Sequence, residues 1–65
     1  MIFLARVVLQ HQEYPDNRYI TTENEIVEAD TEEEAEAKII KALTVDDAYG
    51  HDIYVASIKL KKAIV

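Results

Sequence analysis

Two histidines are the side chains in this sequence best suited to proton transfer near neutral pH. His51 lies close in the sequence to Asp46, Asp47 and Asp52, and imidazole and carboxylate groups together can hold a metal ion or act as an acid and a base. The sequence has no HExxH spacing, and the other histidine, His11, belongs to a distant segment. We therefore expect both imidazoles to lie in exposed polar segments and the protein not to be an enzyme. A small-molecule or metal binder that uses the loop of His51 is kept as an alternative function.

Carboxylates are concentrated in one stretch of the sequence. Eight Asp and Glu residues, and no Lys or Arg, lie between Glu23 and Glu36. Such a surface suits docking on a basic protein, or imitation of nucleic-acid phosphate on a DNA- or RNA-binding protein. A capped helix N-terminus beside a solvated strand edge explains the same residues without any function. The candidate partner-binding residues are Glu23, Glu25, Glu28, Glu32, Glu33 and Glu36.

Aromatic and basic residues are the ones with which proteins hold nucleic acids. The chain has four tyrosines, and its only basic cluster lies within residues 59–62. A formal net charge of −6 opposes phosphate binding. We therefore expect no direct nucleic-acid binding. Each tyrosine is expected to pack in the core or at its rim, and contact with another protein is the functional alternative.

A hairpin, a helix and a third strand are expected to position these residues. Residues 2–10 are rich in branched side chains and are largely apolar in both alternating sets, which predicts a central strand with both faces at least partly covered. The Tyr-Pro-Asp-Asn segment at residues 14–17 predicts a four-residue turn. A second strand over residues 18–29 then completes an antiparallel hairpin.

The length of the turn determines which residues of the hairpin are expected to face each other. With four turn residues, the numbers of paired residues sum to 31, so Glu13 lies opposite Arg18 and Leu4 lies opposite Val27. Opposite charges that face each other across the two strands favour this register by a few tenths of a kcal/mol for each pair. A shift of one residue would move every side chain of the second strand to the other face.

A helix is expected from residue 32 to residue 43. Thr31 and Glu34 form a capping box, in which the Thr31 hydroxyl accepts the backbone N–H of Glu34 and the Glu34 carboxylate accepts the N–H of Thr31. Gly50, the only glycine, is expected to supply a positive φ in the connector that follows the helix. One apolar stripe faces the sheet and consists of Ala35, Ile39, Ala42 and Leu43.

The order of strand, strand, helix and strand predicts an α+β fold with a single ββαβ domain over residues 1–65. A right-handed crossover makes the third strand, expected at residues 53–61, parallel to the second. Placing it beside the first strand gives a three-stranded mixed sheet of order 2-1-3 with the helix on one face. The opposite face then carries apolar side chains that need a partner. The candidate self-association residues are Leu4, Val8, Tyr19 and Val27.

Length and composition indicate a marginal monomer. For 65 residues of 7.4 kDa, burial of apolar surface contributes roughly 100 kcal/mol and chain ordering costs about the same. No cysteine is present to form a disulfide, so we expect a homodimer.

No run of about 18 apolar residues and no signal-peptide pattern occurs, so we expect no membrane span and a cytoplasmic location. No cofactor is expected.

The passage from Val27 to Ala35 resembles the strand-to-helix segment of HicB-type antitoxin domains and of many small ββαβ proteins. The Pro- and Gly-containing segment that usually precedes the helix in HicB-type chains is missing, so no function is carried over from this resemblance. Size, acidity and the absence of a catalytic set are also similar to those of small phage accessory proteins. The leading expectation is a non-enzymatic module that binds another protein as an inhibitor or adaptor.

Overall fold

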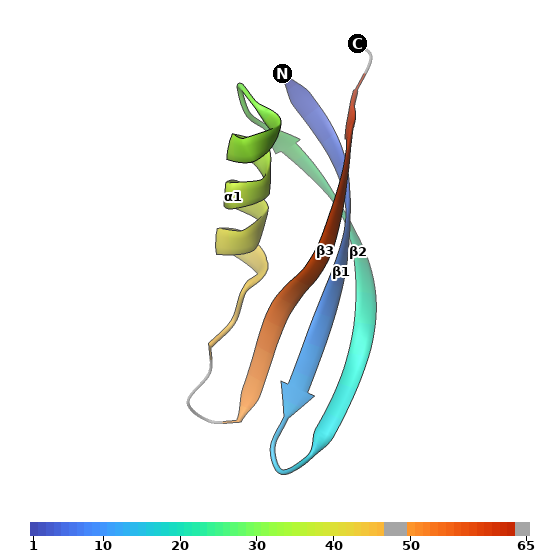
Figure 1. The fold of residues 1–65 in the computed structure, drawn as a ribbon, viewed down its shortest axis with the longest axis vertical. Coiled ribbons are helices and arrows are strands. Elements are labelled where there is room, and N and C mark those ends of the chain that lie inside the picture. Colours follow the sequence, from blue (N-terminus) through green and yellow to red (C-terminus); the bar gives the residue numbers. More distant parts are fainter. Residues whose placement is uncertain (47–49, 64–65) are drawn as a thin grey trace.

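The computed structural model describes residues 1–46 and 50–63. Three strands and one helix follow each other as β1 (Ile2–Glu13), β2 (Asn17–Glu28), α1 (Glu32–Leu43) and β3 (His51–Lys62). The predicted ββαβ order and the predicted helix are therefore confirmed. Each strand is longer than a typical strand, and the three make a long, twisted sheet with α1 against one side of one half of it (Figure 1).

The sheet has the predicted strand order β2-β1-β3. Both neighbouring pairs are antiparallel, so the description of the sheet as mixed was wrong. The strands β2 and β3 do run in the same direction, but they are never neighbours. The crossover through α1 carries the chain over β1 to the far edge, and β1 is antiparallel to both of its neighbours.

The hairpin register differs from the predicted one by one residue. Glu13 lies opposite Asn17, and Leu4 lies opposite Ile26. The reason is the length of the turn: the loop occupies only residues 14–16, because Asn17 already belongs to β2. The Tyr14–Pro15 peptide bond in this loop is cis.

This register decides the two faces of the sheet. The covered face is the side of the sheet on which α1 packs, and it carries the odd-numbered residues of β1, of which Phe3 and Val7 are fully buried. Residues directly opposite each other point to the same side. Val27, opposite Phe3, and Tyr19, opposite His11, therefore lie on the covered face, and their expected place on the uncovered face was wrong. The open face, the side away from α1, carries the even-numbered residues of β1 and β2.

A bulge in β3 preserves the apolar pattern of the covered face. Val8 pairs with Ser57 and Leu9 pairs with Val55, so Ala56 has no partner on β1. Such an extra residue shifts the alternation of side chains by one. As a result the residues of β3 that pack on the core change from odd to even numbers along the strand. They are Ile53, Val55, Ile58 and Leu60.

The start of α1 follows the sequence prediction closely. The Thr31 hydroxyl accepts the backbone N–H of Glu34 at 3.1 Å, as expected for an N-cap. The Glu34 carboxylate reaches the N–H of Asp30 at 3.3 Å, one residue earlier than the predicted Thr31. Of the predicted apolar stripe, Ala35 and Ile39 are buried and Ala42 is exposed.

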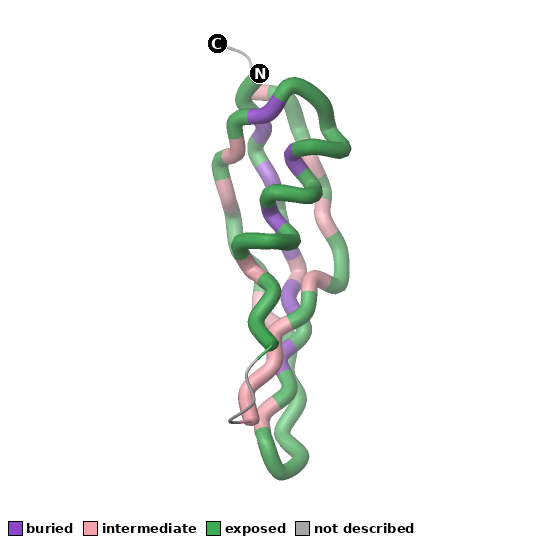
Figure 2. The backbone as a smooth tube through the Cα atoms, turned by 90° about the vertical axis from the view of Figure 1, so that its left-hand side faces the viewer, coloured by how far each residue is buried: buried purple, intermediate pink, exposed green. Residues whose placement is uncertain are grey.

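The buried core is small and lies along β1 beneath the helix (Figure 2). The protein measures 45 × 18 × 13 Å, and its radius of gyration of 13.1 Å exceeds the about 11 Å expected for a compact chain of this length. It exposes 5010 Å², whereas about 4,200 Å² is typical of a monomer of this mass. The fold thus leaves more surface in solvent than its size requires. The fully or nearly buried apolar residues are Phe3, Ala5, Val7, Leu9, Ala29, Ala35 and Ile39.

Candidate functional site

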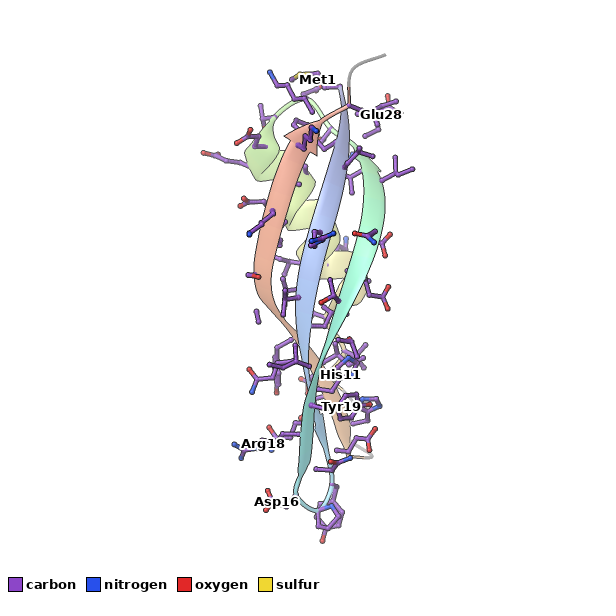
Figure 3. All side chains as sticks on the ribbon, turned by 90° about the vertical axis from the view of Figure 1, so that its right-hand side faces the viewer. Met1, His11, Asp16, Arg18, Tyr19 and Glu28 are labelled. Atoms are coloured by element: carbon purple, nitrogen blue, oxygen red, sulfur yellow. The ribbon has the colours of Figure 1, made fainter. Side chains whose placement is uncertain are left out.

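The open face of the sheet has no element of the described chain packed on it (Figure 3). Leu4 and Val8, two of the predicted self-association residues, lie on this face, Leu4 exposed and Val8 half-buried. Ile26 stands opposite Leu4 and Ile20 lies further along the same strand, and these two have exposed fractions of 75% and 68%. Isoleucines this exposed are an unusual feature of a solvated strand, because their burial contributes about 1.5–3 kcal/mol each.

The open face is hollow where the N-terminal part of β1 lies between the C-terminal parts of β2 and β3. A depression of about 560 Å³ lies across all three strands, with Leu4 and Ile26 among its apolar lining residues. Three cations, Arg6, Lys59 and Lys61, also line it, as does one acidic residue, Glu25. The register explains this grouping, because Lys59 lies opposite Arg6 and Lys61 lies opposite Leu4. Within the described parts of the chain, none of the three cations is within ion-pairing distance of a carboxylate.

The charges of the protein are therefore divided between its two faces. Four of the seven Lys and Arg residues lie on the open face, namely the three cations of the hollow and Arg18. Only two of the thirteen carboxylates, Glu28 and Asp52, belong to strand positions of that face. An anionic partner would thus meet a cationic surface on a protein whose formal net charge is −6. This surface was not predicted from the sequence, because the cations are far apart in the chain and become neighbours only through the strand pairing.

The six predicted acidic binding residues do not all lie on one face. Glu23 and Glu25 stand on the covered side of β2, and Glu28 stands on the open side. The remaining three, Glu32, Glu33 and Glu36, are exposed on α1, two of them in its first turn. Lys38 lies among these carboxylates, 3.4 Å from Glu34, with its ammonium group donating to the backbone oxygen of Glu28 at 2.7 Å.

The two histidines, predicted to be unrelated and exposed, contact each other on the covered face. His11 Nδ1 lies 3.2 Å from His51 Nε2, and His11 Nε2 lies 2.6 Å from the Thr21 hydroxyl. The Tyr19 ring stacks on His11 with centroids 4.4 Å apart and an interplanar angle of 8°. The expectation of exposure was wrong for His11, of which only 8% is exposed. We call these four residues and Glu13 the polar cluster.

Glu13 closes the polar cluster on its solvent side. Its carboxylate accepts the Tyr19 hydroxyl at 2.7 Å and the Asn17 amide at 3.2 Å, and it lies 3.8 Å from His51 Nε2. The hydrogen bond from Tyr19 is the main reason why the pKa of Glu13 is lowered below 4.5, and the hydrogen bond from Asn17 adds to it. The same bond raises the pKa of the Tyr19 hydroxyl above 10.0, since it holds the proton on the phenol.

A signal for the polar cluster exists in the sequence. His11 continues the alternation of Phe3, Val7 and Leu9, so a strand extended to residue 13 places it on the covered face. The orientation of His51 has no such signal. It depends on the bulge at Ala56, because an uninterrupted alternation from Leu60 would turn His51 toward the open face.

The polar cluster is arranged as a set of packed, hydrogen-bonded side chains. Among residues 1–46 and 50–63, no three His, Asp or Glu side chains converge in a geometry that would hold a metal ion. Asp46, one of the residues considered for such a site, is exposed, and Asp47 lies outside the described residues.

No helix of the described chain has the length and apolar character needed to cross a membrane. Searches of protein-family models, curated proteins and solved structures find no match to this chain.

Proposed function

We propose that the protein is a non-enzymatic binding module that docks on another protein through the open face of its sheet. The observation that carries this proposal is the hollow of about 560 Å³, in which exposed Leu4 and Ile26 adjoin three unpaired cations of the described chain. Apolar anchors surrounded by charged groups are the usual composition of a protein interface. Inhibition or adaptation of the partner by simple occupancy needs no catalytic group on this face.

The chemistry of the hollow defines the kind of partner. The aliphatic side chains fit an apolar side chain of the partner, and the cations around them fit Asp or Glu residues beside it. Single-stranded nucleic acid fits less well, because base stacking needs aromatic platforms and Tyr54 is the one aromatic residue at a described strand position of this face. A formal net charge of −6 also disfavours phosphate binding.

A comparison of variants in one cell lysate tests this proposal. The parent protein and a Leu4→Glu variant are immobilised, and the proteins that each captures are identified and compared. The matched control is Ile40→Glu, since Ile40 is an isoleucine exposed to a similar extent as Leu4 but lies on α1. We expect a captured protein to be lost with Leu4→Glu and retained with Ile40→Glu, with both variants folded by circular dichroism.

Two other results would assign the function differently. Loss of the partner with Glu23, Glu25 and Glu28 changed together to Gln, but not with Leu4→Glu, would place binding on the acidic residues. If binding then weakened steeply with salt and the partner were a DNA- or RNA-binding protein, the chain would be an acidic mimic of nucleic acid. Capture of RNA or DNA itself through the open face would contradict the proposal.

A further inference from the structure

The sheet has two edge strands, and they differ in how well their outer edges are protected. β3 carries the bulge at Ala56, and its Ile53 exchanges backbone hydrogen bonds with Val45 at 2.9 and 3.0 Å. Bulges and covering segments are common devices that keep an edge strand from pairing with another chain. Along β2, the described structure shows a single such contact, from Lys38 to the backbone oxygen of Glu28. The rest of this twelve-residue edge is open.

The backbone groups that face outward along β2 belong to the even-numbered residues. The N–H of Ala29 donates inward, to the backbone oxygen of Met1, and the oxygen of Glu28 faces outward to Lys38. Inward and outward residues alternate along an antiparallel strand. Residues 18, 20, 22, 24 and 26 therefore offer their N–H and C=O groups to whatever lies beside the edge.

The side chains at these outward positions are complementary to themselves. Arg18 and Glu28 lie five residues on either side of Glu23, and Ile20 and Ile26 lie three residues on either side of it. An antiparallel second copy of β2 centred on Glu23 would set Ile20 against Ile26 and Arg18 against Glu28, and each pairing would occur twice. Figure 3 shows Arg18 and Glu28 at opposite ends of the strand, as this arrangement requires. In the described structure neither of the two charged groups has an ion-pair partner.

We propose that two copies of this chain associate through their β2 edges, with a two-fold axis passing between the two Glu23 residues. The result is one antiparallel sheet of six strands, three from each copy, with both helices on one side and both open faces on the other. This dimer uses the edge rather than Leu4 and Val8, which stay outside the interface on the open face. It goes beyond the proposed function and does not depend on it.

Other registers of the same pairing match the side chains less well. Residues opposite each other in a strand pair point to the same side of the sheet. The two helices therefore lie on the same side only if the numbers of paired residues add up to an even number. The nearest registers of this kind are centred on Thr22 or Asn24. Centring on Thr22 sets Arg18 against Ile26, and centring on Asn24 sets Ile20 against Glu28. Only the register centred on Glu23 joins apolar to apolar and cation to anion side chains. Its unfavourable feature is the direct opposition of the two Glu23 carboxylates.

Analytical ultracentrifugation from micromolar to millimolar concentration tests this dimer and its register. We expect the parent protein to dimerise reversibly. Arg18→Glu turns two cross-strand attractions into repulsions and should raise the dissociation constant about tenfold, as should Glu28→Arg. The double variant Arg18→Glu/Glu28→Arg exchanges the partners and should restore the parent dissociation constant. Glu23→Gln should lower it, because the like charges at the axis are removed.

The matched control is Lys59→Glu, which makes the same change of charge on the open face and should leave the dimer intact. A concentration-independent 7.4 kDa species would overturn the proposal. So would a dimer that Leu4→Glu dissociates while Arg18→Glu does not, since that dimer forms through the open face. If a single variant loses its circular dichroism signal, the double variant Arg18→Glu/Glu28→Arg is measured instead. Restoration of the dimer in that double variant would show that the two residues pair, because a purely structural role of either residue does not explain it.

Discussion

His11 and His51 are in contact through their ring nitrogens, with Nδ1 of the first 3.2 Å from Nε2 of the second. A hydrogen bond between two imidazoles needs one donor and one acceptor, so at least one ring is neutral in this arrangement. The contact joins the middle strand of the sheet to the start of β3 in the half of the sheet that α1 does not cover. Polar side chains thus extend the packing of the covered face beyond the end of the apolar core.

The variant His11→Leu tests how much the polar cluster stabilises the fold. The substitution removes the hydrogen bonds of His11 to the Thr21 hydroxyl and to His51, and the loss of each costs about 0.5–1.5 kcal/mol. The melting temperature should fall by roughly 4–8 °C for each kcal/mol in a domain of this size. The control is His51→Leu, which keeps the hydrogen bond of His11 to Thr21 and its stacking with Tyr19 and should therefore cost less. An equal or larger loss with His51→Leu would contradict this order.

Tyr19→Phe tests the cause of the lowered pKa of Glu13. Without the Tyr19 hydroxyl, the pKa of Glu13 should rise toward 4.5, and Tyr54→Phe, at a distant hydroxyl that bonds Asp52, should leave it unchanged. The pKa of Glu13 in both variants is measured by following the NMR chemical shift of its carboxyl carbon as the pH is changed. A pKa of Glu13 that does not move in Tyr19→Phe would show that Asn17 or the histidines cause the shift.

The pH dependence of stability follows from the same hydrogen bond. Because folding lowers the pKa of Glu13, its contribution is present above the carboxyl pKa of the unfolded chain and is lost as pH falls through the folded value. Because folding raises the pKa of Tyr19, the contribution of Tyr19 is lost only as pH rises through its value above 10.0. The difference in unfolding free energy between the parent and Tyr19→Phe should therefore shrink at both extremes and be largest near neutral pH.

Thr31→Ala removes the side chain that caps α1. The hydroxyl that accepts the N–H of Glu34 is lost, and such a loss costs about 1 kcal/mol, or several degrees of melting temperature in a domain of this size. Thr44→Ala is the matched control at the other end of α1. There the backbone N–H of residue 44 donates to the backbone oxygen of Ile40, and alanine retains this hydrogen bond, so the melting temperature should not change. Equal melting temperatures for Thr31→Ala and the parent would mean that the cap contributes nothing.

Gly50→Ala should destabilise the junction between the hairpin loop and β3. Gly50 has a φ of 107°, and an added Cβ would lie 2.8 Å from Cβ of Tyr14, whose N–H donates to the Gly50 oxygen at 2.6 Å. We expect a loss of more than about 1 kcal/mol in a denaturant titration. In a Tyr14→Gly background the steric part disappears, so the cost of Gly50→Ala should fall there. An undiminished cost would assign the whole effect to the backbone conformation.

The helix illustrates what local sequence signals are able to predict. Its residues, from Glu32 to Leu43, and its capping threonine were predicted correctly, because the cap and the apolar stripe are set within one or two turns of the chain. The positive φ of Gly50 was predicted for a similar reason, since it reflects a property of that residue type. The strand order was also correct, because an apolar pattern in both alternating sets of β1 favours the central position.

The hairpin register was not predictable to the residue, and the candidate site depends on it. A turn shorter by one residue moves Tyr19 and Val27 to the covered face and turns Ile20 and Ile26 outward, although the local pattern of β2 fits both arrangements. The cationic hollow on the open face follows from this register and from the pairing of Arg6 with Lys59.

The sequence by itself determined the elements of this protein, their order and the start of its helix. The tertiary structure alone decided which side chains meet, because strand pairing alternates between two faces and a single loop residue or a single bulge exchanges them. The bulge at Ala56 turns His51 toward His11, and the three-residue loop turns Ile26 toward Leu4. His11 and His51, like Leu4 and Ile26, are distant in the sequence, and no local pattern brings them together.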